Sequence, residues 1–239
     1  MTTVITGASR GIGRAVAEHH FFACQKLVLV SRTKDNKQRQ INTAHFPADV
    51  ADFNSASLVT RIFDEPVDTL VCSAGVGLSQ ATETADPADW ARVFDVNVNG
   101  ALNYIRQVLP GMLKIGRGTI VLISSTAGIY GYKRNAAYTA SKHALVGMAK
   151  SIAQEHGKRG IVCVPVCPGF VMTDMTERTI DGLIKHQGLS REQAVAKVAA
   201  VSPQNRIITA QEVAEAVAFI CSGKCPSLSG SPLVLSGGE

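Results

Sequence analysis

A short apolar strand that runs directly into a glycine-rich turn is the feature that most constrains how this chain can fold. Val4-Ile5, flanked by threonines, reads as a buried strand, and the turn from Thr6 to Gly13 is followed by a helical stretch. Glycines at such a turn let the backbone approach a pyrophosphate, and the helix N-terminus adds N–H donors and a positive dipole end. The turn predicts a dinucleotide site formed by Gly7, Ser9, Arg10, Gly11, Ile12 and Gly13.

The spacing of the glycines in this turn restricts the class of nucleotide that it can bind. It is Gly-x3-Gly-x-Gly and lacks the Gly-Lys-Ser/Thr ending of a triphosphate-binding loop, which argues against ATP or GTP. A tight strand-to-helix turn without any ligand is the other interpretation, and the remaining motifs have to decide between the two.

Apolar strands and helical stretches alternate along the whole chain. Continuous apolar runs are typical of parallel strands that are covered on both faces. The pattern predicts a single α/β domain over residues 1–239, with a Rossmann-type doubly wound parallel sheet of about seven strands and a ligand crevice at their carboxyl ends. The expected strands are Thr3–Thr6, Leu27–Ser31, His45–Pro47, Thr69–Cys72, Thr119–Ser124, Ile161–Val166 and Pro232–Leu235. The expected helices are Arg14–Cys24, Ser55–Phe63, Pro87–Ile115, Ala136–His156 and Ala210–Cys221.

Composition and charge exclude several other classes of protein. The chain is 46% hydrophobic, yet no run approaches the ~20 apolar residues that a membrane-spanning helix needs. A net charge of +5 without a block of lysines or arginines gives no case for nucleic-acid binding. The six cysteines are scattered without a histidine pair, so we expect free thiols and no metal site. With no leader sequence in view, we expect a cytoplasmic protein.

The segment Tyr138-Thr-Ala-Ser-Lys142 carries the strongest chemical signal. On a helix, residues i and i+4 share one face. A free tyrosine loses its proton near pH ~10, and a neighbouring ammonium group favours the phenolate. The pair can therefore act as a general acid or base near neutral pH. Two exposed helix residues are the ordinary alternative for so short a pattern.

Further motifs follow in a fixed order. Ser125 ends an apolar strand 13 residues before Tyr138, Asn97 lies 41 residues before it, and Pro168-Gly169 follows another apolar strand. This ordered set resembles the short-chain dehydrogenase/reductase family over essentially the whole chain. The general look is similar to 3-oxoacyl-[acyl-carrier-protein] reductases and acetoacetyl-CoA reductases. The resemblance implies an enzyme, an NAD(P)(H)-dependent oxidoreductase acting on CH–OH and C=O groups.

The resemblance also implies a role for each matched residue. Tyr138 would protonate the carbonyl oxygen, or remove the alcohol proton in the reverse direction. Lys142 would lower the tyrosine pKa and bind the nicotinamide ribose, and Ser125 would polarise the carbonyl. Asn97 would hold a water that links Lys142 to solvent. The cofactor would contact Asp49, Val50, Ala74, Gly75, Tyr138, Lys142, Pro168, Gly169, Val171 and Thr173.

The choice of cofactor can be argued from charge. An acidic residue at the end of the second strand would bind the ribose 2′-OH of NAD and repel a 2′-phosphate. Ser31-Arg32 stands there instead, and the glycine turn carries Ser9-Arg10. Two guanidinium groups and two hydroxyls suit a phosphate, so we predict NADP(H) in preference to NAD(H). Two solvated surface arginines are the alternative.

Two motifs depart from the family pattern. The usual Asn-Asn-Ala-Gly reads Cys72-Ser-Ala-Gly75, which removes an asparagine that normally ties the central strands together. Ser236 stands before Gly237-Gly238, where the family usually has an aspartate. In addition, the stretch 33–48 is mostly polar and short, so we expect a loop with at most a turn or two of helix.

The substrate is less constrained. Residues 172–206, expected to form a lid, combine apolar and basic side chains. The leading hypothesis is NADPH-dependent reduction of a 3-oxoacyl thioester, on acyl carrier protein or coenzyme A, with a small-molecule ketone or alcohol as the broader class. A dehydrogenase of a sterol, sugar or secondary alcohol, and a catalytically idle nucleotide-binding member of the fold, remain open.

The apolar pattern of the two long helices predicts self-association. Apolar residues wrap much of Ala136–His156, so one stripe covers the sheet and another is left over. We expect a homodimer or homotetramer built on this helix and Pro87–Ile115, with Ala149 a candidate contact.

Overall fold

The computed structural model describes residues 1–23, 25–33, 43–59 and 65–239, and within them seven strands form one sheet. The strand order is β3-β2-β1-β4-β5-β6-β7, and every neighbouring pair is parallel. This confirms the predicted doubly wound α/β sheet. The strands are β1 Thr2–Thr6, β2 Lys26–Ser31, β3 Thr43–Pro47, β4 Thr69–Cys72, β5 Gly118–Ile123, β6 Ile161–Pro168 and β7 Leu233–Leu235.

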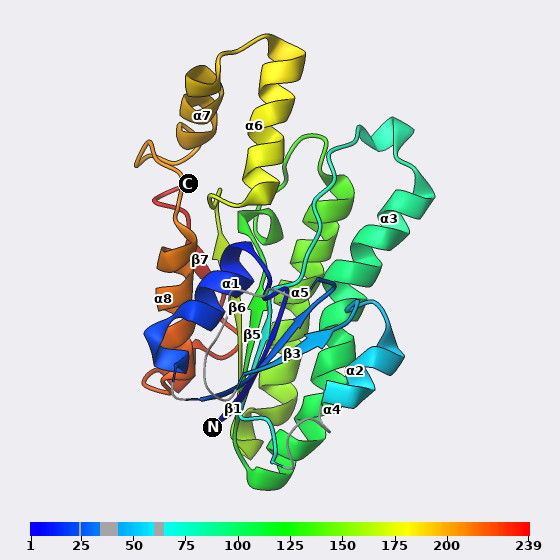
Figure 1. Cartoon of the computed structure of the whole chain (residues 1–239), viewed down its shortest axis with the longest axis vertical. Helices are drawn as coiled ribbons and strands as arrows, with labels where there is room; N and C mark the ends of the chain where they lie inside the picture. The colour runs from blue at the N-terminus through cyan, green and yellow to red at the C-terminus, as the bar shows by residue number, and fades with distance from the viewer. Residues whose placement is uncertain (24, 34–42, 60–64) are drawn as a thin grey trace.

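Helices cover both faces of the sheet (Figure 1). One core lies between the sheet and the helices α2, α4 and α5, and it contains Tyr104 and Ile120. The other lies between the sheet and α1 and α8, and it contains Val16 and Val217. Alternate residues of β1, Val4 and Ile5, enter opposite cores, which explains why these strands are apolar at every position. The helices are α1 Gly11–Glu18, α2 Phe53–Val59, α3 Pro87–Phe94, α4 Gly100–Ile115, α5 Ala136–His156, α6 Asp174–Gln187, α7 Arg191–Ala199 and α8 Ala210–Cys221.

Several helices differ from the sequence-based expectation. The first helix ends at Glu18, and a 3-10 turn over His20–Phe22 follows, so the predicted Arg14–Cys24 helix was too long; Cys24 itself lies outside the described residues. The predicted helix Pro87–Ile115 is continuous but not uniform. A five-residue π-helix, Asp95–Asn99, separates α3 from α4. In a π-helix the backbone bonds run from i to i+5, so each turn holds an extra residue.

The segment predicted to form a lid, residues 172–206, is largely helical. It folds into two helices, α6 and α7, which stand beyond the carboxyl ends of the strands in Figure 1. Ile180, Ala194 and Val198 form a small separate core between them. Part of the predicted loop over residues 33–48 falls on 34–42, outside the described residues, and so does the end of the predicted Ser55–Phe63 helix. No helix among the described residues has the length and apolar character to cross a membrane.

Candidate active site

The glycine turn after β1 packs against the end of β4 at a distance that only glycine allows. Gly7 has a φ of +69°, and a Cβ added to it would lie 2.7 Å from the Ala74 nitrogen. A Cβ on Gly13 would lie 2.4 Å from the Gly7 carbonyl oxygen, which explains the third glycine of the turn. The Thr6 hydroxyl accepts hydrogen bonds from the backbone N–H groups of Ser73 and Ala74, at 3.1 and 3.3 Å. The turn and the end of β4 therefore form one rigid wall.

Cys72, which replaces the asparagine expected from the family pattern, lies at the end of β4, next to the glycine turn. Its side chain is buried in the core between the sheet and α4, and burial raises the pKa of its thiol well above the ordinary range. It behaves as a small apolar side chain. The hydrogen bonds to Thr6 tie β1 to the residues that follow β4, so the central strands are joined there without the missing amide.

Tyr138 and Lys142 lie one turn apart on α5. The Lys142 ammonium is 5.5 Å from the centre of the Tyr138 ring and donates a hydrogen bond to the Ile123 carbonyl oxygen at 2.8 Å. Ser125 lies two residues beyond the end of β5, and its hydroxyl accepts from the Ala127 N–H at 3.1 Å, which caps a short 3-10 turn. The carboxyl end of β5 thus presents Ser125 to the tyrosine that α5 supplies.

The two titratable groups have shifted pKa values. Burial raises the pKa of Tyr138, and a hydrogen bond with Ser125 lowers it by less. Burial lowers the pKa of Lys142 to about 8. The expectation that Lys142 depresses the tyrosine pKa is therefore wrong for this geometry: the ammonium is directed at Ile123, and desolvation dominates at Tyr138.

Asn97 lies in the π-helix and is almost completely buried. Its side-chain oxygen accepts from the Val76 N–H at 2.8 Å, and its nitrogen donates to the Val76 carbonyl at 3.0 Å and to the Ser141 hydroxyl at 2.9 Å. Ser141 in turn donates to the Tyr138 carbonyl at 2.7 Å. Asn97 therefore joins the loop after β4 to α5. Sequence reasoning missed Ser141, and its place directly before Lys142 was the only available signal.

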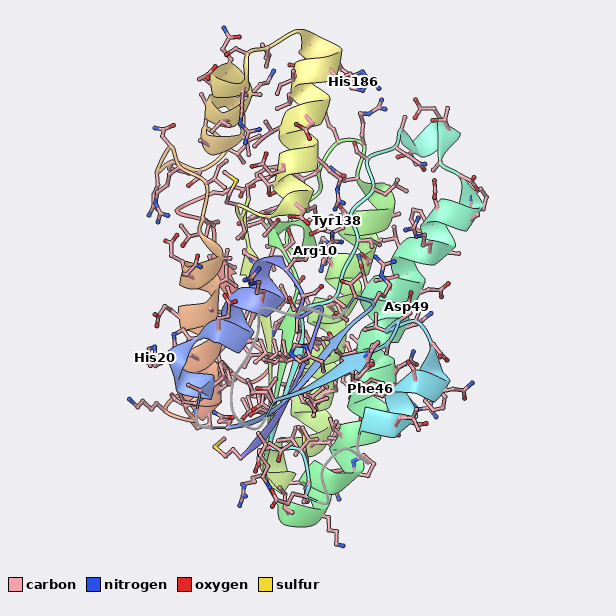
Figure 2. The ribbon with its side chains drawn as sticks, in the orientation of Figure 1. Arg10, His20, Phe46, Asp49, Tyr138 and His186 are labelled. Carbon is pink, nitrogen blue, oxygen red and sulfur yellow. The ribbon has the colours of Figure 1, made fainter. Side chains whose placement is uncertain are left out.

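Gly75 lies beside both polar groups. A Cβ added to Gly75 would lie 3.4 Å from the Asn97 side-chain oxygen and 3.6 Å from the Lys142 nitrogen. Asn97, Lys142 and Tyr138 are thus brought together at one place, as the sequence predicted. Figure 2 shows Tyr138 and Arg10 at the same end of the sheet as Asp49.

The predicted cofactor residues around this centre have different partners. Arg32 is exposed at the end of β2, and the Ser31 hydroxyl donates to the Thr33 carbonyl at 2.5 Å. Arg10 is also exposed, and its guanidinium donates to Asp174 at 3.0 Å. The exposed carboxylate of Asp49 accepts from the Ala51 N–H at 3.0 Å, and the next residue, Val50, is buried.

The turn after β6 lies on the other side of the crevice. The Gly169 N–H donates to the Leu235 carbonyl at 2.9 Å, which fixes the end of β6. The Val171 carbonyl accepts from the Thr176 hydroxyl at 2.6 Å. A Cβ on Gly11 would lie 3.2 Å from the methyl group of Thr173, so this turn approaches the glycine turn across the crevice.

These residues fit a nicotinamide dinucleotide. At Gly7 and Gly13 the missing Cβ lets backbone segments pack closely, and the N-terminus of α1 follows this turn, where its N–H groups can bind a pyrophosphate. Gly75 lies beside Asn97 and Lys142, and Lys142 lies one turn from Tyr138 on α5.

Known proteins align with nearly the whole of this chain at about one-third sequence identity. The family model of the short chain dehydrogenases matches residues 1–184. The 3-oxoacyl-[acyl-carrier-protein] reductase FabG of Escherichia coli K12 is 34% identical, with 98% of this chain and 95% of that protein aligned. The 2-(R)-hydroxypropyl-CoM dehydrogenase of Xanthobacter autotrophicus is 33% identical, with 98% and 96% aligned.

Solved structures of oxidoreductases have the same fold as this chain. Actinorhodin polyketide ketoreductase with NADPH superposes with a TM-score of 0.92 at 29% identity, covering 99% of this chain and 95% of that one. The fold, the order of motifs and these relatives lead to one conclusion. The chain belongs to the short-chain dehydrogenase family and is an NAD(P)-dependent oxidoreductase that acts on CH–OH and C=O groups.

Proposed function

We propose that this protein is an NADPH-dependent reductase of 3-oxoacyl thioesters, with Tyr138 as the general acid. The observation that carries this proposal is geometric: Tyr138 lies one turn from Lys142 on α5 and forms a hydrogen bond with Ser125. A phenol that keeps its proton at neutral pH is suited to donate it to a carbonyl oxygen. Ser125, hydrogen-bonded to Tyr138, holds and polarises that oxygen. The nicotinamide ring, when bound, supplies the hydride.

Lys142 replaces the proton that Tyr138 gives away, and a water held by Asn97 returns a proton from solvent to Lys142. With a pKa of about 8, the Lys142 ammonium is charged at neutral pH but releases a proton more readily than an ordinary lysine. Asn97 is held by Val76 and Ser141, and it places a polar oxygen beside Gly75 and near the lysine. This arrangement supports the role of Asn97 in a water-mediated relay to solvent.

Arg10 and Arg32 select NADP(H) over NAD(H). The glycine turn and the N-terminus of α1 bind the pyrophosphate, and the two arginines with Ser9 and Ser31 bind the ribose 2′-phosphate. Exposed guanidinium groups near the carboxyl ends of β1 and β2 support this assignment. Asp49 and Val50 bind the adenine, while Pro168, Gly169, Val171 and Thr173 orient the carboxamide.

The substrate class rests on the lid and on the relatives. Met175 of α6 reaches over the loop after β4, where a Cβ on Gly77 would lie 3.0 Å from its sulfur, and Met172 is exposed beside it. An apolar wall of this kind suits an acyl chain. The near-complete alignment with a 3-oxoacyl-[acyl-carrier-protein] reductase favours a thioester over a free ketone.

Oxidation of NADPH, followed at 340 nm with a panel of ketones, tests this proposal. Acetoacetyl-CoA should be turned over with a higher kcat/KM than a sugar, a steroid ketone or a simple ketone, and NADPH should exceed NADH. A clear preference for a sugar or sterol would move the protein to another substrate class. Cofactor binding without turnover of any ketone would contradict the enzymatic proposal.

A further inference from the structure

Arg10 has a partner that cofactor choice alone does not account for. Its guanidinium lies 3.0 Å from the carboxylate of Asp174, the first residue of α6. Both side chains are more than half exposed, at 57% and 59%. The contact joins the glycine turn to the lid over 164 residues of sequence. The residue proposed to bind the 2′-phosphate is therefore also the residue that holds the lid.

The two partners of Arg10 carry the same charge. A phosphate offers nearly two negative charges and several acceptor oxygens, and arginine binds it in a bidentate manner. An exposed carboxylate–arginine pair is much weaker. It changes the equilibrium constant for forming the contact by a factor of up to about five. A phosphate at Arg10 also meets the negative charge of Asp174 across the same guanidinium. Phosphate binding should therefore displace the carboxylate.

We propose that Asp174 is a cofactor-specificity residue, which competes with the ribose 2′-phosphate for Arg10 and so couples binding of NADP(H) to release of the first turn of α6. This inference rests on the proposed preference for NADP(H). It assigns to Asp174 a function opposite to that of Arg10: the arginine favours the phosphorylated cofactor, and the aspartate limits how strongly it does so.

The neighbours of Asp174 explain why this contact can control the lid. Thr173 lies against the glycine turn at Gly11, and Met175 lies against the loop after β4 at Gly77. The first turn of α6 thus contacts both walls of the crevice. The Thr173 and Met175 contacts are apolar, whereas the Arg10–Asp174 pair is ionic and is open to competition from a phosphate. By linkage, the factor by which Asp174 weakens phosphate binding is the factor by which the phosphate weakens the lid contact.

Two nucleotides that differ only in the 2′-phosphate test the competition. Calorimetry with 2′,5′-ADP and with 5′-AMP is carried out on the wild type, Asp174→Asn and Asp181→Asn. Asp181 lies two turns further along α6, is exposed, and has no ion pair among the described residues, so it controls for the loss of charge. Asp174→Asn should bind 2′,5′-ADP about two- to fivefold more tightly. Its affinity for 5′-AMP, and both affinities of Asp181→Asn, should stay at the wild-type values.

Hydrogen exchange of residues 174–187 tests the coupling to the lid. In the wild type, 2′,5′-ADP should increase exchange at the start of this helix relative to 5′-AMP, and in Asp174→Asn the two nucleotides should give the same exchange. Unchanged or weaker binding of 2′,5′-ADP to Asp174→Asn would overturn the inference, because Asp174 would then be neutral or would position Arg10. If the wild type does not prefer 2′,5′-ADP over 5′-AMP, the cofactor proposal fails as well.

Discussion

The proposed catalytic centre and the proposed cofactor rim lie at the same end of the sheet, but their polar groups are held in opposite ways. In the centre, Asn97 and Lys142 are buried and bonded to backbone and side-chain partners at 2.8–3.0 Å. At the rim, which comprises Arg10, Arg32 and Asp174, the side chains are exposed, and the one ion pair among them is exposed on both sides.

This difference decides how easily the polar groups of each region can exchange their partners. A buried polar group that loses its partner costs about 1–3 kcal/mol, so the centre has a single stable arrangement. An exposed ion pair contributes about 0.2–1 kcal/mol, so the rim can exchange partners at little cost. The rigid region is the one that we propose to transfer protons, and the adaptable region is the one that we propose to select the cofactor.

The largest effect is expected at the centre. Tyr138→Phe keeps the ring but removes the proton donor, so kcat should fall about 10²–10⁴-fold while NADPH still binds. Steady-state kinetics and cofactor titration measure the two quantities. Tyr130→Phe, at an exposed tyrosine in the segment between β5 and α5, is the control and should have little effect. Retained turnover in Tyr138→Phe would remove the general acid from the mechanism.

Burial of Lys142 predicts a dependence of stability on pH. The folded pKa is lowered from 10.5 to about 8, so the unfolded chain binds more protons between these values, and the stability contributed by this site rises with pH there. Below about pH 8 the cost of the buried charge is fully present. Compared with Lys142→Met, the wild type should gain about 3 kcal/mol from pH 7 to 10.5 in urea unfolding. A difference that does not vary with pH would show that the ammonium is not desolvated.

A smaller effect is expected at the rim. Arg32→Asp should lower the ratio of kcat/KM for NADPH over NADH about tenfold or more, because one charge-assisted phosphate contact contributes roughly 1.5–3 kcal/mol. Arg92→Asp, at an exposed position of α3, makes the same charge change away from the cofactor. An unchanged ratio in Arg32→Asp would mean that the rim does not read the 2′-phosphate.

The smallest effect on the chemistry is expected on the outer side of α5. Ala149, a candidate contact on the apolar pattern, is wholly buried against the sheet and is not available to a partner. Gly147 is exposed, and a Cβ there would meet nothing within 4 Å. Gly147→Glu should therefore leave the monomer folded but dissociate a dimer that pairs through α4 and α5. Light scattering measures the mass, and a wild type near 25.3 kDa would refute the predicted assembly.

Local patterns in the sequence predicted much of this protein. The apolar runs gave the strands to within a few residues, since a strand buried on both faces must be apolar throughout. The four-residue spacing of Tyr138 and Lys142 placed both on one face of α5, because helix geometry is local. The glycine turn predicted a close backbone approach between a strand and a helix, and in the structure Gly7 makes such an approach to Ala74. The dinucleotide site inferred from the same turn stays a prediction.

Contacts between distant segments were decided by the tertiary structure. Nothing near Asp95–Asn99 indicates a π-helix, whose geometry matters because it brings Asn97 to Ser141, 44 residues away. The pairing of Arg10 with Asp174, and the direction of the Lys142 ammonium toward Ile123, also arise only when the lid and β5 are in place. Elements and chemical groups are encoded by short-range periodicity and residue type. Their partners, and hence their pKa values, depend on which surfaces the packed sheet brings within a few ångströms of one another.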